Sequence, residues 1–357
     1  MAHSATLPRS EAYLATRVTI MSGRLMDADA IGAMVDRPLS QIPRLEGFSE
    51  LMERQATGSA RSRAVENALI RMLLAECTII LRAITGDLRQ LFTFWARRFE
   101  LFNLKALIRG KLHGLDPATI EDNLYDLPPY TTLPKERLLQ AESVTELLKL
   151  LEATPYGDIA RQARLAFEDR AEALYLDATI DRRYFQGLVK RVDRLEDRHR
   201  EPLRRLVRGL VDHTNLIWLL RYRFSYGLSP AETYYVLIPH GLRLDRALLQ
   251  RLCGLPDPRA VLAQLPQRLR DALGSAGSAV AVERALERHY RDTAQAHLSS
   301  NASAPARAFA YLLLREIDLK RLQAVIQGKS LQLAPELVRE ALGLKGDEAG
   351  PARDRAP

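Results

Sequence analysis

Two sequence segments recur three times along this chain, and this self-similarity limits the possible fold more than any other feature. Copies of the first segment lie 112 and 106 residues apart and read FELFNLKALIRGK (99–111), VDHTNLIWLLRYR (211–223) and IDLKRLQAVIQGK (317–329). Copies of the second lie 111 and 106 residues apart and read VENALIRML (65–73), LDATIDRRY (176–184) and VERALERHY (282–290). Because two independent segments repeat at nearly equal offsets, the periodicity that all helices share does not explain the matches.

The repeat offset sets the size of each unit. An interval of 106 to 112 residues is too long for a solenoid, whose units run to about 50 residues. Each copy is therefore predicted to be a domain-sized bundle of about four helices with its own core. The joints are marked by Pro134 and Pro239, 105 residues apart. We predict three helical repeats followed by a disordered tail, at residues 13–130, 131–238, 239–344 and 345–357.

Apolar spacing predicts the secondary structure. Val65, Ala68, Leu69, Met72 and Leu73 form one stripe at helical intervals. The alternation of apolar and polar residues that marks strands is rare, and prolines stand between the apolar stripes, where they end helices. The sequence therefore predicts an all-α protein.

Composition and charge exclude several classes of protein. With 47% hydrophobic and 27% charged residues, the chain is typical of a globular protein. Cys77 and Cys253 are far apart, which indicates a reducing compartment and no disulfide scaffold. We expect no secretory signal and no membrane span, because arginine or glutamate interrupts every apolar run before the required ~20 residues. The net charge of +8 would suit an acidic partner, but the arginines alternate with acids along the chain, which favours solvated helix faces.

Motifs that would indicate chemistry or nucleic-acid binding are missing from the sequence. The seven histidines include no pair at i and i+4, and no third ligand accompanies His289 and His297. The chain has no phosphate-binding loop, dinucleotide-binding glycine motif, nucleophile elbow or aspartate-rich magnesium motif. It also has no zinc finger, RRM signature or basic arm. We therefore predict no catalytic, cofactor-binding or metal-binding residue and no nucleic-acid partner.

Charged positions that recur in every copy predict structural contacts. The recurring acids of the first segment are Glu100, Asp212 and Asp318, and the recurring arginines of the second are Arg71, Arg182 and Arg288. We predict three ion pairs, which join Glu100 with Arg71, Asp212 with Arg182, and Asp318 with Arg288. In the alternative, each acid caps the start of a helix or meets a base further along its own helix, such as Arg221 for Asp212.

Basic residues near the end of the first segment are candidates for contact with a partner. They are Arg109, Lys111, Arg221, Arg223 and Lys329.

The order and spacing of these segments resemble a known family. The stretch YLATRVTIMSGRLM (13–26), the string at 99–111 and the three acid–leucine–base segments are similar to the C subunit of V-type and archaeal-type ATPases, called the d subunit in eukaryotes. The resemblance extends over residues 13–344. The middle copy departs from the pattern, because Tyr222 stands where the other copies have Gly110 and Gly328.

The resemblance implies a fold and a function. It implies a funnel of three helical units related by a pseudo-threefold axis, on the cytoplasmic side of a membrane. The funnel would rest on the membrane rotor ring and receive the central stalk, as a non-catalytic adaptor between the ATP-hydrolysing head and the ion-translocating ring. The transported ion, proton or sodium, is left open. The alternative function is that of a helical scaffold, in an unrelated complex, that binds an acidic partner.

Overall fold

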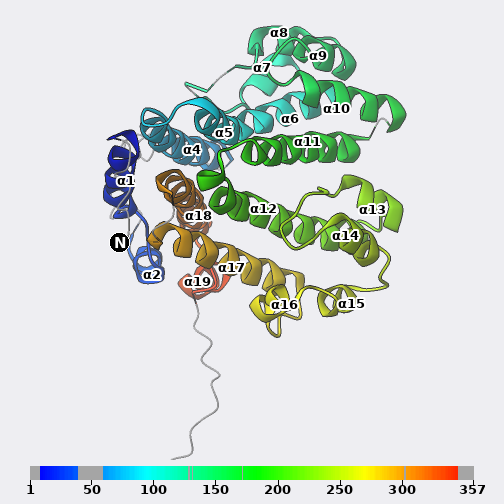
Figure 1. Ribbon diagram of the computed structural model, residues 1–357. Helices are drawn as coiled ribbons and strands as arrows, with labels where there is room; N and C mark the ends of the chain where they lie inside the picture. The colour runs from blue at the N-terminus through cyan, green and yellow to red at the C-terminus, as the bar shows by residue number, and fades with distance from the viewer. Residues whose placement is uncertain are drawn as a thin grey trace, which may run out of the picture.

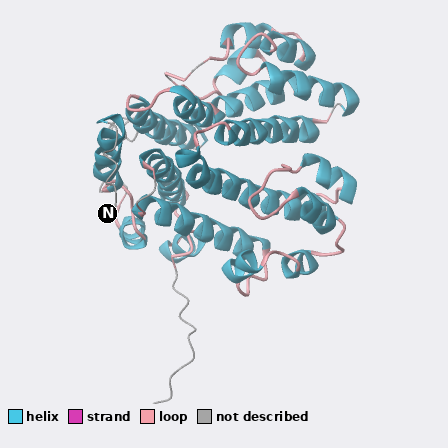
Figure 2. Ribbon diagram, viewed as in Figure 1, coloured by secondary structure: helices cyan, strands magenta, loops and turns pink. Residues whose placement is uncertain are grey.

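The computed structural model describes residues 9–38, 59–127, 129–130, 132–170, 172–300 and 303–344. Within these ranges every regular element is a helix, as predicted, and no strand occurs (Figure 1, Figure 2). The predicted disordered tail, residues 345–357, lies outside the described residues.

The helices occur in the following order along the chain. The N-terminal half contains α1 (Arg9–Ser22), α2 (Ala28–Asp36), α4 (Ser59–Leu81), α5 (Gly86–Ala96), α6 (Arg98–Leu112), α7 (Pro117–Glu121), α8 (Lys135–Gln140), α9 (Val144–Leu151) and α10 (Gly157–Arg170). The C-terminal half contains α11 (Ala173–Asp193), α12 (Asp197–Leu220), the π-helical turn η2 (Arg221–Ser225), α13 (Pro230–Val236), α14 (Arg246–Cys253), α15 (Pro258–Ala263), α16 (Gln267–Leu273), α17 (Ala279–Ser299), α18 (Ala304–Ser330) and α19 (Pro335–Ala341).

Both recurring segments fall on long helices. The second segment lies on α4, α11 and α17, which have 23, 21 and 21 residues. The first segment lies on α6, α12 and α18, and in the middle copy its last three residues lie on η2. In the first copy this helix is preceded almost directly by α5, because Arg97 (φ −64°, ψ −10°) alone separates the two. A short helix that begins with proline follows each time, namely α7, α13 and α19.

The long helices pack side by side into one body. α10 packs on α11, α11 on α12, α12 on α17, and α17 on α18. Figure 1 shows α10, α11, α12 and α17 as successive layers, with α8 and α9 beyond α10 and the short helices α13 to α16 along one edge. α18 also contacts α1 and α4, so a helix near the C-terminus lies against the most N-terminal described helix.

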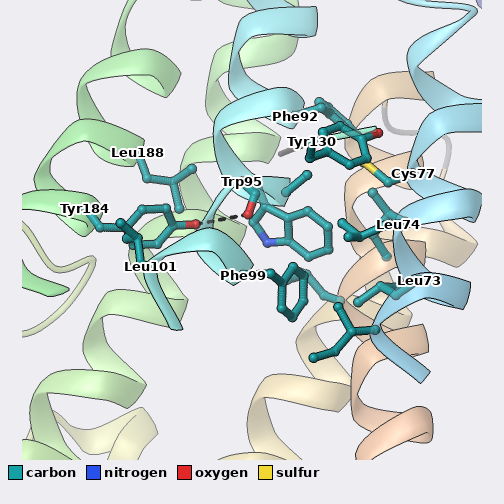
Figure 3. Packing of buried hydrophobic residues seen from close by; sticks show 14 of the residues in the cluster. Leu73, Leu74, Cys77, Phe92, Trp95, Phe99, Leu101, Tyr130, Tyr184 and Leu188 are labelled. Carbon is teal, nitrogen blue, oxygen red and sulfur yellow. Dashed lines mark hydrogen bonds between the residues drawn. The ribbon is translucent and has the colours of Figure 1, made fainter. Parts of the chain in front are cut away.

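Aromatic side chains fill the core where α5 meets α18. Trp95 and Phe92 of α5 are fully buried and pack edge-on against Phe309 of α18, with ring centroids 5.7 and 5.4 Å away. Figure 3 shows Trp95 between Phe99 and Tyr184, whose hydroxyl donates a hydrogen bond to the Trp95 carbonyl. These contacts tie the first part of the chain to its last long helix.

An ion pair joins the same two regions. The Arg98 guanidinium bonds to Glu316 of α18 and lies 4.0 Å from the centroid of the Trp95 ring. Burial alone would raise the pKa of Glu316, but the charges of Arg98 and Lys320 outweigh it and lower that pKa to about 2. Glu316 therefore stays ionised, as the partner of a buried arginine should.

The middle copy accommodates Tyr222 by inserting one residue. In the outer copies the amide of Leu115 or Leu333 donates to the carbonyl of Gly110 or Gly328, five residues earlier, at 2.9 Å. In the middle copy Leu228 donates to Tyr222, six residues earlier, at 3.0 Å. The extra residue is taken up by η2, whose wider turn is typical of a single-residue insertion in a helix.

Glycine is required where the outer copies have it, because a short helix crosses at that point. A Cβ atom on Gly328 would lie 2.6 Å from Val338 of α19, closer than real contacts allow. Gly209, inside α12, has open space around its missing side chain.

We expect Gly328→Ala to lower the free energy of unfolding by about 1–3 kcal/mol through overpacking. The matched control Gly209→Ala should leave it unchanged or raise it by up to about 1 kcal/mol. Urea unfolding measures both changes, and equal effects at the two glycines would contradict this packing.

Candidate functional site

Each copy of the first segment carries an acid and a base eleven residues apart, on one long helix in the outer copies and on α12 and the adjoining η2 in the middle copy. They are Glu100 and Lys111, Asp212 and Arg223, and Asp318 and Lys329. Eleven residues make close to three helical turns, so the two side chains point from the same face about 16 Å apart. Each such pair holds a short helix at both ends, and we call the arrangement a helix clamp.

The acid of each helix clamp accepts hydrogen bonds from backbone amides just before the short helix begins. Asp212 accepts from Arg243 at 2.8 Å and from Leu244 at 3.0 Å, ahead of α14. Asp318 accepts from Met26 at 2.8 Å, ahead of α2. Glu100 accepts from the amides of Thr132 and Leu133, ahead of α8, and from the Tyr156 hydroxyl. The three acids are at most 4% exposed, so these bonds replace the water that each carboxylate loses.

The base of each helix clamp donates to backbone carbonyls at the other end of the same short helix. Lys111 donates to Leu139 of α8 at 2.5 Å, and Arg223 donates to Cys253 of α14 at 3.2 Å. Lys329 donates to Val35 and Arg37, at the end of α2, at 2.6 Å each.

This placement stabilises helices that are too short to be stable alone. α8, α14 and α2 have 6, 8 and 9 residues, whereas isolated helices need about 12–15 residues to be even marginally stable in water. The carboxylate lies at the positive end of each short helix and the base at its negative end, which suits the helix dipole. A long helix therefore fixes the position of its short helix at both ends.

The third helix clamp differs in that it holds a helix from the opposite end of the chain. α2 packs against α18 and α19, although sequence analysis assigned residues 13–130 to one unit. Arg291 of α17 strengthens this clamp, because its guanidinium lies 3.0 Å from Asp318 and donates to the Met26 carbonyl at 2.8 Å. The N-terminal helix α2 thus occupies, beside α18, the place that α8 and α14 occupy beside α6 and α12.

The predicted pairing of the acids with Arg71, Arg182 and Arg288 is wrong in each copy. Arg71 lies 3.6 Å from Asp126 instead. Arg182 lies over the Tyr235 ring, 5.4 Å from its centroid, and burial lowers its pKa. Arg288 is exposed, and the arginine beside Asp318 is Arg291, one turn further along α17. The acids bind backbone amides ahead of a helix instead, which is close to the capping role left open as the alternative.

Three of the five basic residues proposed for partner contact are used inside the protein. Lys111, Arg223 and Lys329 are the bases of the helix clamps. Arg221 is exposed. The Arg109 side chain is 53% exposed, with Asp177 4.0 Å away. Only Arg109 and Arg221 of this set keep an exposed charge.

A second recurring contact, which the sequence-based predictions do not include, occurs in the first two copies. Asn103 exchanges two hydrogen bonds with the backbone of Tyr125, at 2.7 and 2.8 Å, and Asn215 does the same with Ile238 at 2.8 Å. The signal was present, because asparagine follows the acid by three residues in both copies. Arg321 takes this place in the third copy and lies 3.3 Å from Glu287.

Among the described residues we find no cluster of metal ligands, no reactive thiol and no membrane-spanning helix. No three histidine, cysteine or carboxylate side chains among these residues gather as metal ligands. Both cysteines are buried, which raises the pKa of Cys77 to about 12 and that of Cys253 to about 11, so neither thiol ionises readily. No helix within the same ranges is long and apolar enough to span a bilayer.

Comparison with known proteins gives a consistent result over almost the whole chain. The family model described as ATP synthase (C/AC39) subunit matches residues 14–341. The chain is 24% identical to the C subunit of the A-type ATP synthase of Methanosarcina mazei, over 93% of this chain and 92% of that protein. It is 26% identical to the protein of the same name from Methanothermobacter thermautotrophicus, over 93% and 87%. It is 24% identical to that from Pyrococcus horikoshii, over 93% and 90%.

The middle helix clamp should make stability depend on pH. Burial raises the pKa of Asp212 from 3.8 to about 6, against the opposing effect of its backbone hydrogen bonds. The folded protein therefore binds this proton more tightly than the unfolded chain does. The stabilisation of the folded state that comes from protonated Asp212 is fully present below pH 3.8 and is lost as the pH rises through about 6. Relative to Asp212→Asn, the wild type should lose on the order of 3 kcal/mol of unfolding free energy between pH 4 and 7.

Urea unfolding at several pH values tests this expectation. The exposed Asp292→Asn variant is the control and should keep the pH profile of the wild type. An Asp212→Asn profile parallel to that of the wild type would contradict the prediction.

Proposed function

This chain belongs to the ATP synthase (C/AC39) subunit family, and from that premise we propose that it is a non-catalytic adaptor in the central stalk of a rotary ATPase. In this role it couples the ATP-hydrolysing head to the membrane rotor ring that moves protons or sodium ions. Its partners are the rotor-ring subunits and the other central-stalk subunits. It attaches at the cytoplasmic side through protein contacts.

We further propose that the chain forms three related units around a pseudo-threefold axis, which together make a funnel. The first unit centres on α4 to α10, the second on α11 to α16, and the third on α17 to α19. These bounds replace the predicted ones, 13–130, 131–238 and 239–344, because α6 holds α8 and α12 holds α14. The third is completed by α2, since Asp318 and Lys329 hold α2 as the other helix clamps hold α8 and α14. The rotor ring lies on the wide side of this funnel, and the stalk end enters its cavity.

The recurring helix clamp is the observation that carries the coupling role. An adaptor that transmits torque must resist twisting, and hydrogen bonds at both ends of a short helix oppose its rotation against the long helix. In addition, α2 near the N-terminus is bonded to α18 near the C-terminus, so a force on one of these helices is transmitted to the other through Asp318 and Lys329. Rigid helices joined in this way transmit torque better than long loops do.

The ends of the long helices are the proposed contact regions. The loop after each long helix exposes a large apolar side chain, namely Leu115 (43% exposed), Tyr226 (57%) and Leu333 (46%). The exposed charges of Arg109 and Arg221 lie near two of these loops. Apolar side chains beside positive charge suit a partner surface that is apolar with an acidic rim.

A binding experiment with vesicles tests the proposal. The purified chain should sediment with vesicles that carry the rotor ring and remain in solution with protein-free liposomes of the same lipids. The double variant Arg109→Glu/Arg221→Glu should bind several-fold more weakly, and binding should fall with salt, because charge is screened beyond about 10 Å at 0.1 M.

Arg268→Glu, on the exposed face of α16, is the matched control and should bind like the wild type. Equal sedimentation with protein-free liposomes would refute attachment through protein contacts. Equal weakening by Arg268→Glu would refute the proposed contact regions.

A further inference from the structure

A cavity of about 400 Å³ lies where α4 ends, beside the junction of α5 and α6. Three arginines line it: Arg82, Arg89 and Arg97. Another wall is formed by Pro129, Tyr130 and Thr132, and Figure 3 shows Tyr130 beside Cys77 and Phe92. No carboxylate of the described residues lines the cavity. We call it the arginine pocket.

The three guanidinium groups lack partners of opposite charge. No carboxylate among the described residues lies within 4.0 Å of Arg82, Arg89 or Arg97. The Nε atom of Arg97 is buried and makes no hydrogen bond. Arg82 and Arg89 are exposed and Arg97 is half-buried. Other half-buried arginines have a partner, since Arg98 pairs with Glu316 and Arg182 lies over the Tyr235 ring. Three unpaired positive charges around one cavity repel each other, and an orphaned buried donor costs about 1–3 kcal/mol.

Three of the hydroxyl groups that line the arginine pocket, those of Thr78, Tyr130 and Thr132, are engaged with the protein. The Thr78 hydroxyl donates to the Leu74 carbonyl at 2.8 Å and lies 3.0 Å from the Tyr130 hydroxyl. The Thr132 hydroxyl donates to Glu100, whose carboxylate also accepts backbone amides. The guanidinium groups are therefore the main donors left for a ligand. One of them is already held in place, because Arg89 donates to the carbonyl of Leu81 at the end of α4.

We propose that the arginine pocket binds a phosphate-bearing ligand through Arg82, Arg89 and Arg97. The planar guanidinium fork matches phosphate oxygens with two parallel hydrogen bonds. A single phosphate group carries about 1.5 to 2 negative charges at pH 7, so a diphosphate group balances three arginines better. Two sources carry this chemistry, a soluble diphosphate and a phospholipid headgroup. The arginine pocket shares Thr132 with the first helix clamp, but its three arginines take no part in a clamp, and the proposal does not depend on the coupling role.

Calorimetric titration of the full chain with pyrophosphate at low salt tests the proposal. We expect saturable binding at one site. The double variant Arg82→Gln/Arg97→Gln should bind at least about tenfold more weakly, since it removes charge-assisted hydrogen bonds. The control Arg259→Gln/Arg268→Gln removes the same charge from exposed positions on α15 and α16 and should change affinity by less than about twofold.

Competition identifies the source of the phosphate group. Displacement of pyrophosphate by ADP assigns the pocket to soluble diphosphates, and displacement by vesicles containing phosphatidic acid assigns it to a headgroup; both results support the site. Thermal unfolding checks that each variant is folded. If the double variant does not fold, the single variant Arg82→Gln, at an exposed position, replaces it in the titration. The absence of saturable pyrophosphate binding, or an equal loss in the control, would overturn the proposal.

Discussion

An acid and a base three turns apart along a continuous helical segment organise this structure, because together they fix a short helix that is too short to be stable alone. The acid binds amides ahead of the short helix, as Asp212 does, and the base binds carbonyls at its end, as Arg223 does. The arrangement occurs on α6, α12 and α18. Burying a carboxylate is costly, and the backbone bonds offset that cost only while the short helix stays in register. In every helix clamp, the position of the short helix and the burial of the charged acid therefore depend on each other.

The third helix clamp links residues from opposite ends of the sequence. Asp318 and the Met26 amide are 292 positions apart, yet the bond between them is 2.8 Å long. Contacts of such separation carry a large loop-closure cost and form slowly. This bond connects the segment just before the N-terminal helix α2 to α18 near the C-terminus. α18 is connected to the first part of the chain a second time, through the contact of Trp95 with Phe309 and the ion pair of Arg98 with Glu316. Such contacts between the two ends of the chain suit the proposed adaptor, because they keep its helices from separating when torque is applied.

The sequence predicted the helical class, the recurring positions and the family, because these depend on periodicity and spacing within each segment. It identified Glu100, Asp212 and Asp318 as structural but assigned them the wrong partners. The partners common to all three acids are backbone amides, which carry no side-chain signature, on loops that return 31 to 33 residues later or from the N-terminus. The arginine that does pair with Asp318 is Arg291, three residues beyond the predicted Arg288. The one-residue insertion at η2 was visible only as Tyr222 in place of glycine. The arginine pocket left no motif, since Arg82, Arg89 and Arg97 come together only through the packing of α4 on α5.

Hydrogen exchange of α2 measures the third helix clamp most directly. In the Asp318→Ala and Lys329→Met variants, amides of Ala28–Asp36 should exchange at least about tenfold faster, because the short helix opens locally once either end is released. Amides of α8 and α14, held by their own clamps, should keep the exchange rates of the wild type. Unchanged exchange in α2, or acceleration spread evenly over all three short helices, would contradict the account.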